Sequence, residues 1–267
     1  MLISKKLILL AICLVFVAAA CNKNQTDSPA GSNSKTEAKI DTKVSWEIDM
    51  DQKKWEPSRT PPPCPDVEFI SPVDLSKVTS VLYPGQYRGE DGGYRVHGGF
   101  RFDKQPDTKI DVRAPFDAYV YRGSRYLVGG KLQYVFDFVH PCGIMYRLGH
   151  LYVVEPKLQE LAEKFPQPKE GDSRDHMTKR VVVEKGELLA TEVGVPGNVF
   201  VDWGVYDLRQ ENEASKNSTY RNQHGWFSYL SFHGLCWLDY LPADEEKIVK
   251  SLPGGDLKKG KQSDYCK

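Results

Sequence analysis

The sequence has no excess of either charge. Its 267 residues include 36 Lys and Arg and 36 Asp and Glu. Proteins that bind nucleic acid usually carry a basic patch or a recognisable motif, and this chain has neither. The charge balance therefore argues against nucleic acid as a partner.

The motifs of several catalytic classes are also absent. No G-x-S-x-G, S-x-x-K or Cys–His arrangement stands out, and no glycine-rich loop follows a strand and opens a helix. No internal repeat or second domain is visible. These absences argue against serine or cysteine nucleophiles and against a nucleotide-binding fold.

Long apolar runs are missing except at the N-terminus, where Lys5 and Lys6 precede an apolar run over 7–17. This length is typical of a signal peptide rather than a membrane span. The run ends in Ala18-Ala-Ala-Cys21, which resembles a bacterial lipoprotein signal. The resemblance implies cleavage after residue 20 and lipidation of Cys21; ordinary secretion with an incidental cysteine is the alternative.

Export would remove two lysines and leave 34 basic against 36 acidic side chains, a net charge of −2. The chain would be anchored to a membrane through its N-terminal lipid, in the bacterial cell envelope. Asn22 stands where Asp would signal inner-membrane retention in some bacteria. The expected location is therefore the periplasmic face of the outer membrane.

Residues 21–63 are predicted to be a tether. Asn22 to Lys43 is rich in Asn, Ser, Thr and Lys, with almost nothing to bury, and Thr60-Pro-Pro-Pro63 is a stiff approach to the domain. Trp46 and Trp55 are expected to pack back on the domain; a partner-binding strip is the alternative.

The cysteines fit an oxidising compartment. Cys13 leaves with the signal peptide and Cys21 takes the lipid, so four remain: Cys64, Cys142, Cys236 and Cys266. An even number of cysteines in an exported protein predicts two disulfides, and the sequence permits three pairings. Metal ligation by His140 and Cys142 is the less favoured alternative.

Residues 64–267 are predicted to form one mainly β domain. Short runs rich in Val, Ile, Tyr and Phe recur between Gly and Pro residues, and Gly129-Gly130 is typical of a hairpin turn. Apolar spacing over 156–165 predicts a short inserted helix, and 243–252 predicts a C-terminal helix. Residues 211–223 are expected to be a loop. The aromatic stretch 224–241 is expected to be a strand covering a sheet face, with a carbohydrate-stacking surface as the alternative.

Two strand-like segments carry the residues with chemical potential. Alternation over 94–103 places His97, Gly99, Arg101 and Asp103 on one face. Alternation over 198–206 does the same for Phe200, Asp202, Gly204 and Tyr206. His150 lies between these segments in Tyr146-Arg-Leu-Gly-His-Leu151.

In this order, five blocks resemble the M23 (LytM, lysostaphin-type) family of zinc metallopeptidases that cut peptidoglycan cross-bridges. The blocks are His97-Gly-Gly-Phe-Arg101, Ala114-Pro-Phe-Asp-Ala-Tyr-Val120, Tyr146-Arg-Leu-Gly-His-Leu151, Val183-Glu-Lys-Gly-Glu-Leu-Leu-Ala190 and Phe200-Val-Asp-Trp-Gly204. They cover residues 94–209, under half of the chain. The resemblance implies an antiparallel M23-like β domain.

The chain departs from the family at the zinc ligands. The three ligand positions hold His97, Arg101 and Asp202, and a catalytic histidine position holds Phe200. Catalytic zinc needs three N, O or S ligands, and Arg is a permanent cation that cannot ligate. We therefore expect no zinc, a salt bridge between Arg101 and Asp202 in its place, and His150 as a catalytic remnant.

The function implied is binding without hydrolysis. Members of the family that have lost zinc ligands commonly regulate cell-wall hydrolases, so the expected partner is peptidoglycan or such a hydrolase. The binding groove would contain His97, Arg101, Asp103, His150 and Asp202. The alternatives are an active zinc peptidase with rearranged ligands, in which His97, Asp103 and Asp202 bind the metal, and a structural envelope protein.

Overall fold

The computed structural model describes residues 40–49, 51, 54–89 and 91–267. The predicted signal peptide over 1–20, Cys21 and the first part of the tether lie outside these residues. Within the described ranges, no helix is long and apolar enough to cross a membrane.

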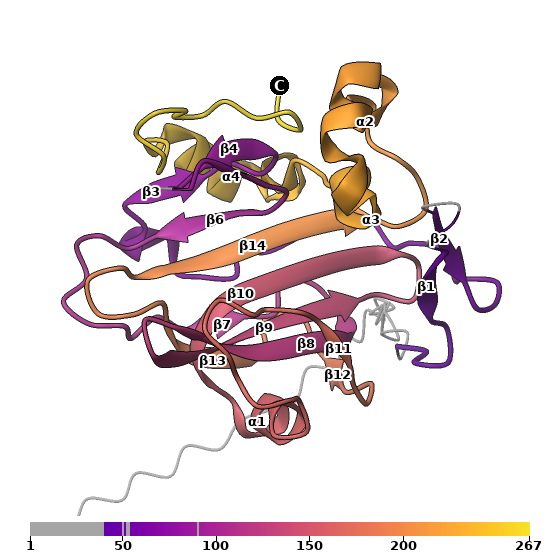
Figure 1. Ribbon diagram of the computed structural model, residues 1–267, viewed down its shortest axis with the longest axis horizontal. Helices are drawn as coiled ribbons and strands as arrows, with labels where there is room; N and C mark the ends of the chain where they lie inside the picture. Colours follow the sequence, from indigo (N-terminus) through magenta and orange to yellow (C-terminus); the bar gives the residue numbers. More distant parts are fainter. Residues whose placement is uncertain (1–39, 50, 52–53, 90) are drawn as a thin grey trace, which may run out of the picture. The chain divides into compact units, whose positions relative to one another are not determined.

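A large antiparallel sheet organises the chain (Figure 1). Its strands follow the order β3, β6, β14, β10, β9, β8 and β11, while β12 pairs with β8, β13 pairs with β10, and β7 pairs with β13. Their bounds are β3 Ser80–Leu82, β6 Gly98–Arg101, β7 Val112–Arg113, β8 Ala118–Val128, β9 Lys131–Val139, β10 Ile144–Val154, β11 His176–Met177, β12 Val182–Val183, β13 Leu188–Val193 and β14 Phe200–Asp207. The mainly β prediction is confirmed.

The two faces of this sheet carry different side chains, and one of them packs on the main apolar core. On β14, the alternate residues Val201, Trp203 and Val205 belong to the main apolar core, which also contains Phe136 of β9 and Leu148 of β10. The intervening positions of β14 face the other way, because successive side chains on a strand alternate. That second face carries the candidate site.

The central hairpin follows the predicted turn. Gly129 and Gly130 join β8 to β9 with φ values of +56° and +73°. These left-handed values suit glycine, because a Cβ would make them costly. Strand β10 then returns along β9, and β14 pairs along its other edge.

Both predicted helices are present. Helix α1, Pro156–Ala162, buries Leu158, Leu161 and Ala162, and helix α4, Ala243–Ser251, buries Val249. Each begins where the sequence predicts. The structure therefore confirms the inserted helix and the C-terminal helix.

The predicted strand over 224–241 is wrong, and so is the loop over 211–223. This region forms short helical segments: η2 Glu213–Lys216, α2 Ser218–His224, η3 Gly225–Phe227, α3 Ser228–Ser231 and η4 Trp237–Tyr240. Asn217 caps α2, since its side chain accepts hydrogen bonds from the backbone N–H groups of Thr219 (2.8 Å) and Tyr220 (3.3 Å). Tyr220 and His224, four residues apart, are the buried positions of that helix.

The folded unit begins before the predicted boundary at Cys64. Strands β1, Trp46–Asp49, and β2, Lys54–Pro57, form an antiparallel hairpin. Trp46 and Trp55 are buried, and their indole N–H groups donate to the carbonyls of Pro141 (3.0 Å) and Tyr229 (2.7 Å). The prediction that the tryptophans pack back on the domain is confirmed, and β1 and β2 are part of the domain rather than of the tether.

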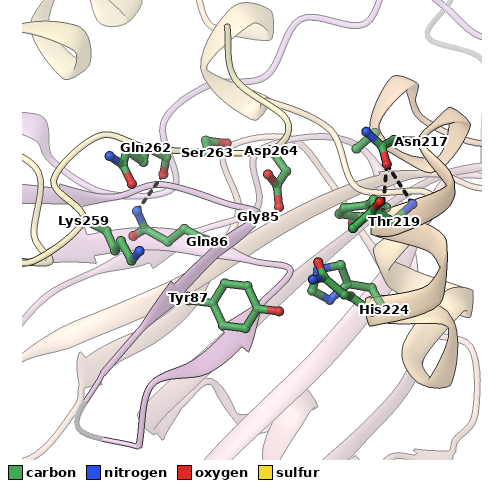
Figure 2. Close-up of a pocket in the computed structure, with 13 residues that line it drawn as sticks. Gly85, Gln86, Tyr87, Asn217, Thr219, His224, Lys259, Gln262, Ser263 and Asp264 are labelled. Atoms are coloured by element: carbon green, nitrogen blue, oxygen red, sulfur yellow. Dashed lines mark hydrogen bonds between the residues drawn. The ribbon is translucent and has the colours of Figure 1, made fainter.

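The C-terminal tail lies beside a second small hairpin, made of β4, Gln86–Arg88, and β5, Gly93–Arg95 (Figure 2). The amide of Gln86 donates to the carbonyl of Gln262 at 2.7 Å, and the backbone N–H of Asp264 donates to the carbonyl of Gly85 at 2.8 Å. A disulfide between Cys236 and Cys266 fixes the end of the tail.

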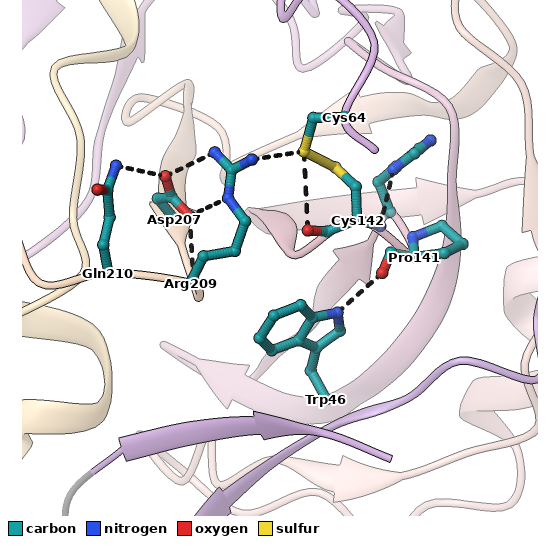
Figure 3. Close-up of a disulfide and its surroundings, with 8 residues drawn as sticks. Trp46, Cys64, Pro141, Cys142, Asp207, Arg209 and Gln210 are labelled. Atoms are coloured by element: carbon teal, nitrogen blue, oxygen red, sulfur yellow. Dashed lines mark hydrogen bonds and ion pairs between the residues drawn. A yellow bond between two sulfur atoms is a disulfide. The ribbon is translucent and has the colours of Figure 1, made fainter. Parts of the chain in front are cut away.

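The second disulfide joins Cys64 to Cys142 in the turn between β9 and β10 (Figure 3). Two disulfides are therefore formed from the four predicted cysteines, and Cys142 is not a metal ligand. His140 instead accepts a hydrogen bond from the backbone N–H of Cys142 at 3.1 Å. Arg209 lies over the bridge and also binds the carboxylate of Asp207.

Removing the Cys236–Cys266 disulfide should destabilise the domain measurably. The bond closes a loop with a sequence separation of 30, and a cross-link of this kind typically contributes about 2–4 kcal/mol. We expect the Cys236→Ala, Cys266→Ala double variant to lower the free energy of unfolding by that amount in a guanidinium titration. An unchanged midpoint would show that the contacts of the tail hold it without the bond.

Candidate functional site

Three neighbouring strands bring His97, Asp202 and His150 together. Asp202 on β14 pairs with Gly99 of β6 on one side and with Gly149 of β10 on the other. His97 directly precedes β6, and His150 follows Gly149. The site is therefore set by strand register, although its residues are distant in sequence.

Asp202 is shared by both imidazoles. Its Oδ2 lies 3.1 Å from Nε2 of His97 and 3.3 Å from Nε2 of His150. The three side chains retain between 14% and 20% of their possible exposure, so solvent reaches the cluster only at its surface. We call these three residues the histidine–aspartate cluster.

The predicted salt bridge between Arg101 and Asp202 is not formed. Arg101 binds Asp103 instead, with Nε at 3.0 Å and Nη2 at 2.7 Å from Oδ1. The register explains this outcome, because Arg101 is opposite Phe200 and its guanidinium lies 5.9 Å from the centre of that ring. Asp103 lies two residues further along the chain, just past the end of β6, and its carboxylate binds the guanidinium of Arg101.

This pairing also removes Asp103 from the alternative ligand set. Besides Arg101, its carboxylate accepts a hydrogen bond from the hydroxyl of Thr79 at 3.1 Å. Of the predicted groove residues, the structure thus brings His97, His150 and Asp202 into one cluster. Arg101 and Asp103 form a separate pair, and Nη2 of Arg101 also reaches Oδ1 of Asn198 at 3.3 Å.

Gln133 is a member of the site that the sequence did not indicate. It is fully buried on β9, its Nε2 donates to the carbonyl of Gly194 at 2.8 Å, and its Oε1 lies 2.5 Å from Nδ1 of His150. Because the amide nitrogen is committed to Gly194, the Oε1 must accept, so Nδ1 of His150 carries hydrogen. Nε2 of His150 then faces Asp202.

His150 also has an unusual backbone. Its φ of +58° is the one positive value among the described non-glycine residues. The pairing of β10 with β9 is irregular between Leu148 and Leu151, and this irregularity turns the imidazole toward Asp202 and Phe200. Its ring centre lies 4.1 Å from that of Phe200. A left-handed residue that is not glycine gives no signal in a sequence.

Gly204 provides room for His97. A Cβ at this position would lie 2.4 Å from the hydroxyl oxygen of Tyr206 and 3.0 Å from Cβ of His97. Any side chain here would displace the imidazole or the phenol. The glycine in the Phe200-Val-Asp-Trp-Gly204 block therefore has a local packing reason.

Burial and charge set the protonation of the cluster. Burial lowers the pKa of His97 and of His150, and the charge of Asp202 raises each of them only in part. Burial would raise the pKa of Asp202, but His97, His150 and the nearby cation Arg88 together lower it. The carboxylate is therefore ionised, and the imidazoles favour their neutral forms at neutral pH.

Arg88 is a second residue that the sequence did not indicate. It is buried on β4, and its guanidinium donates to the carbonyl of Tyr83 at 2.9 Å. Burial lowers its pKa to about 10, so it is a cation at neutral pH. Its charge stabilises Asp202 from the side of the β4–β5 hairpin.

Further along the same sheet face, four charged residues form a buried network. Asp137 is fully buried and accepts hydrogen bonds from Arg122 (2.6 Å) and Arg147 (2.8 Å). Asp175 completes the network at 3.1 Å from Arg147. These charges compensate one another, so the network is structural in character.

The residues present do not fit the zinc ion that the family resemblance implies. Arg101 occupies one ligand position and carries a positive charge, and Asp103 is bound to it. Across the parts of the chain that the structure describes, no group of three or more His, Cys, Asp or Glu side chains is arranged to hold a metal ion.

Replacing Asp202 by Asn should lower the pKa of both imidazoles further. The carboxylate opposes the effect of burial at His97 and His150, and the amide would not. Imidazole chemical shifts followed by NMR from pH 4 to 8 would measure both values. Asp103→Asn is the matched control, because Asp103 pairs with Arg101; a variant at Asp202 that left both titrations unchanged would contradict the assigned contacts.

The lowered pKa values of His97 and His150 also make the stability of the folded protein depend on pH. The folded protein holds protons at these two imidazoles less readily than the unfolded chain does. Their contribution to stability is therefore complete above the ordinary histidine pKa of about 6.5 and is lost as the pH falls below it.

Comparison with known proteins gives little beyond this geometry. No family model matches the chain, and no curated protein matches it. Among solved structures it is similar to that of Helicobacter pylori Csd3, with 12% sequence identity and a TM-score of 0.36, over 74% of this chain and 43% of that one. The chain thus spans less than half of that protein, and a likeness this distant carries no argument about function.

Proposed function

We propose that this protein is an exported lipoprotein whose M23-peptidase-like domain has lost its zinc site and its hydrolytic activity. The domain acts by binding, either to peptidoglycan or to a cell-wall hydrolase that it regulates. The lipid on Cys21 holds it at the periplasmic face of the outer membrane.

The observation that carries this proposal is the pairing at the ligand positions. Asp202 shares one carboxylate oxygen with His97 and His150, while Arg101 occupies the remaining ligand position and is tied to Asp103. An ionised carboxylate that accepts a hydrogen bond from His97 and lies near the cation Arg88 is stable without a dication. A guanidinium close by would repel one.

Such a surface is suited to binding a peptide. Partly exposed imidazoles can donate to or accept from peptide groups, and the ring of Phe200 beside His150 supplies apolar contact. The competing function, a zinc peptidase with rearranged ligands, would require Asp103 to leave Arg101.

Metal content tests the proposal directly. After dialysis with trace zinc, we expect wild-type protein to retain almost none, because Arg101 stands at a ligand position. Restoring the family pattern with Arg101→Asp and Asp202→His should raise zinc toward one per chain, measured by inductively coupled plasma mass spectrometry. Asp103→Asn alone is the control and should bind no zinc.

Hydrolysis and binding complete this test. Wild-type protein should co-sediment with purified peptidoglycan, or capture a cell-wall hydrolase, without releasing soluble fragments. One zinc per wild-type chain, together with cell-wall hydrolysis that a chelator abolishes, would instead establish the metallopeptidase.

The lipid anchor has its own test. Wild-type protein expressed in a bacterium should incorporate labelled fatty acid and fractionate with membranes, because the lipidated Cys21 inserts acyl chains into the bilayer. Cys21→Ser should abolish both. A Cys21→Ser protein that still fractionated with membranes would show another means of attachment.

A further inference from the structure

A cavity is built by β4, α2 and the C-terminal tail (Figure 2). Its volume is about 480 Å³, within the range of small-molecule sites. None of His97, His150 and Asp202 lines it. The cavity is therefore a separate feature and does not depend on the proposed function.

The polar groups of the cavity are mainly neutral. Four carboxamides line it, together with hydroxyl groups, one Lys and one Asp: the amides belong to Gln86, Asn217, Gln223 and Gln262. Lys259 and Asp264 carry opposite charges, so the lining has no excess of either sign. A neutral ligand with many hydroxyl or amide groups suits such a lining better than an anion or a cation does.

Several of these polar groups make no hydrogen bond within the described part of the protein and are accessible to a ligand. Within the described residues, the side chains of Thr219, Gln223 and Gln262 make no hydrogen bond, and Oε1 of the buried Gln86 has no partner. Each carboxamide can both donate and accept. An acetamido group has one donor and one acceptor, and so it complements a carboxamide.

Tyr87 adds an aromatic surface. It is 44% exposed, although the residues on either side of it are buried. Its ring packs edge-on against Tyr94, with centres 5.0 Å apart, and Tyr94 in turn stacks on His224 at 3.7 Å. These two rings hold Tyr87 in place. Its electron-rich face suits the weakly positive C–H groups of a sugar ring.

The cavity is formed before any ligand arrives. The tail is bound to β4 through the contacts of Gln262 and Asp264 described above, and the hydroxyl of Ser263 donates to the carbonyl of Pro84 at 2.5 Å. A Cβ at Gly85 would lie 2.9 Å from the ring of Tyr265, which shows how closely the tail approaches. A preformed site reduces the entropic cost of binding.

We infer that this cavity binds a neutral oligosaccharide that carries acetamido groups. Tyr87 provides the stacking surface for one sugar ring, and the carboxamides of Gln223 and Gln262 pair with acetamido or hydroxyl groups. The glycan is therefore bound between β4, α2 and the C-terminal tail, in a cavity that none of the cluster residues lines.

Calorimetric titration with two trisaccharides tests the inference. Tri-N-acetylchitotriose carries acetamido groups and cellotriose does not, so wild-type protein should bind the former more tightly. Tyr87→Ala should weaken binding about tenfold or more, since it removes the stacking ring. Gln223→Ala should reduce the preference for the acetylated sugar; both residues are exposed, and neither change should affect folding.

Trp226→Ala is the matched control. Trp226 is 77% exposed, follows α2 and does not line the cavity. The Trp226→Ala variant should bind both sugars with the affinity of the wild-type protein. The inference would be overturned by the absence of saccharide binding, by equal affinity for the two sugars, or by loss of binding in Trp226→Ala but not in Tyr87→Ala. Because zinc content is measured separately, failure here would leave the proposed function standing.

Discussion

The ionised carboxylate of Asp202 is the constraint around which the candidate site is arranged. A largely buried anion is costly unless charges or hydrogen bonds compensate it. Here the compensation comes from a hydrogen bond donated by His97 and from the charge of Arg88, which belong to different segments of the chain. Gly204 leaves space for one imidazole, and Gln133 orients the other. A substitution of Asp202 would therefore disturb the contacts of His97 beside β6, of His150 on β10 and, through His150, of Gln133 on β9.

Strand patterning made much of the fold predictable. Alternation placed Phe200, Asp202, Gly204 and Tyr206 on one face, and the glycine pair at 129–130 marked the central turn. The failures have physical causes. The stretch 224–241 is aromatic in composition, yet the Asn217 cap starts a helix just before it. Tertiary burial rather than β propensity then decides its conformation.

The sequence predicted three members of the cluster but neither their pairing nor the buried residues around them. Alternation and the family resemblance identified His97, His150 and Asp202. The choice between Asp202 and Asp103 as the partner of Arg101 depended on register: Gly99, not Arg101, is opposite Asp202. Gln133 and Arg88 were missed because a single polar residue within a strand is usually solvent-exposed. Only the folded arrangement shows that these two are buried beside the cluster.

The N-terminal hairpin and the C-terminal tail extend the domain beyond its large sheet. Both lie outside the residues that resemble the M23 family, and each is fastened to the sheet at specific points: Trp46 and Trp55 for the hairpin, and the Cys236–Cys266 disulfide for the tail. These additions create surfaces that the large sheet alone would not have. The cavity beside Tyr87 exists only because the tail is held there.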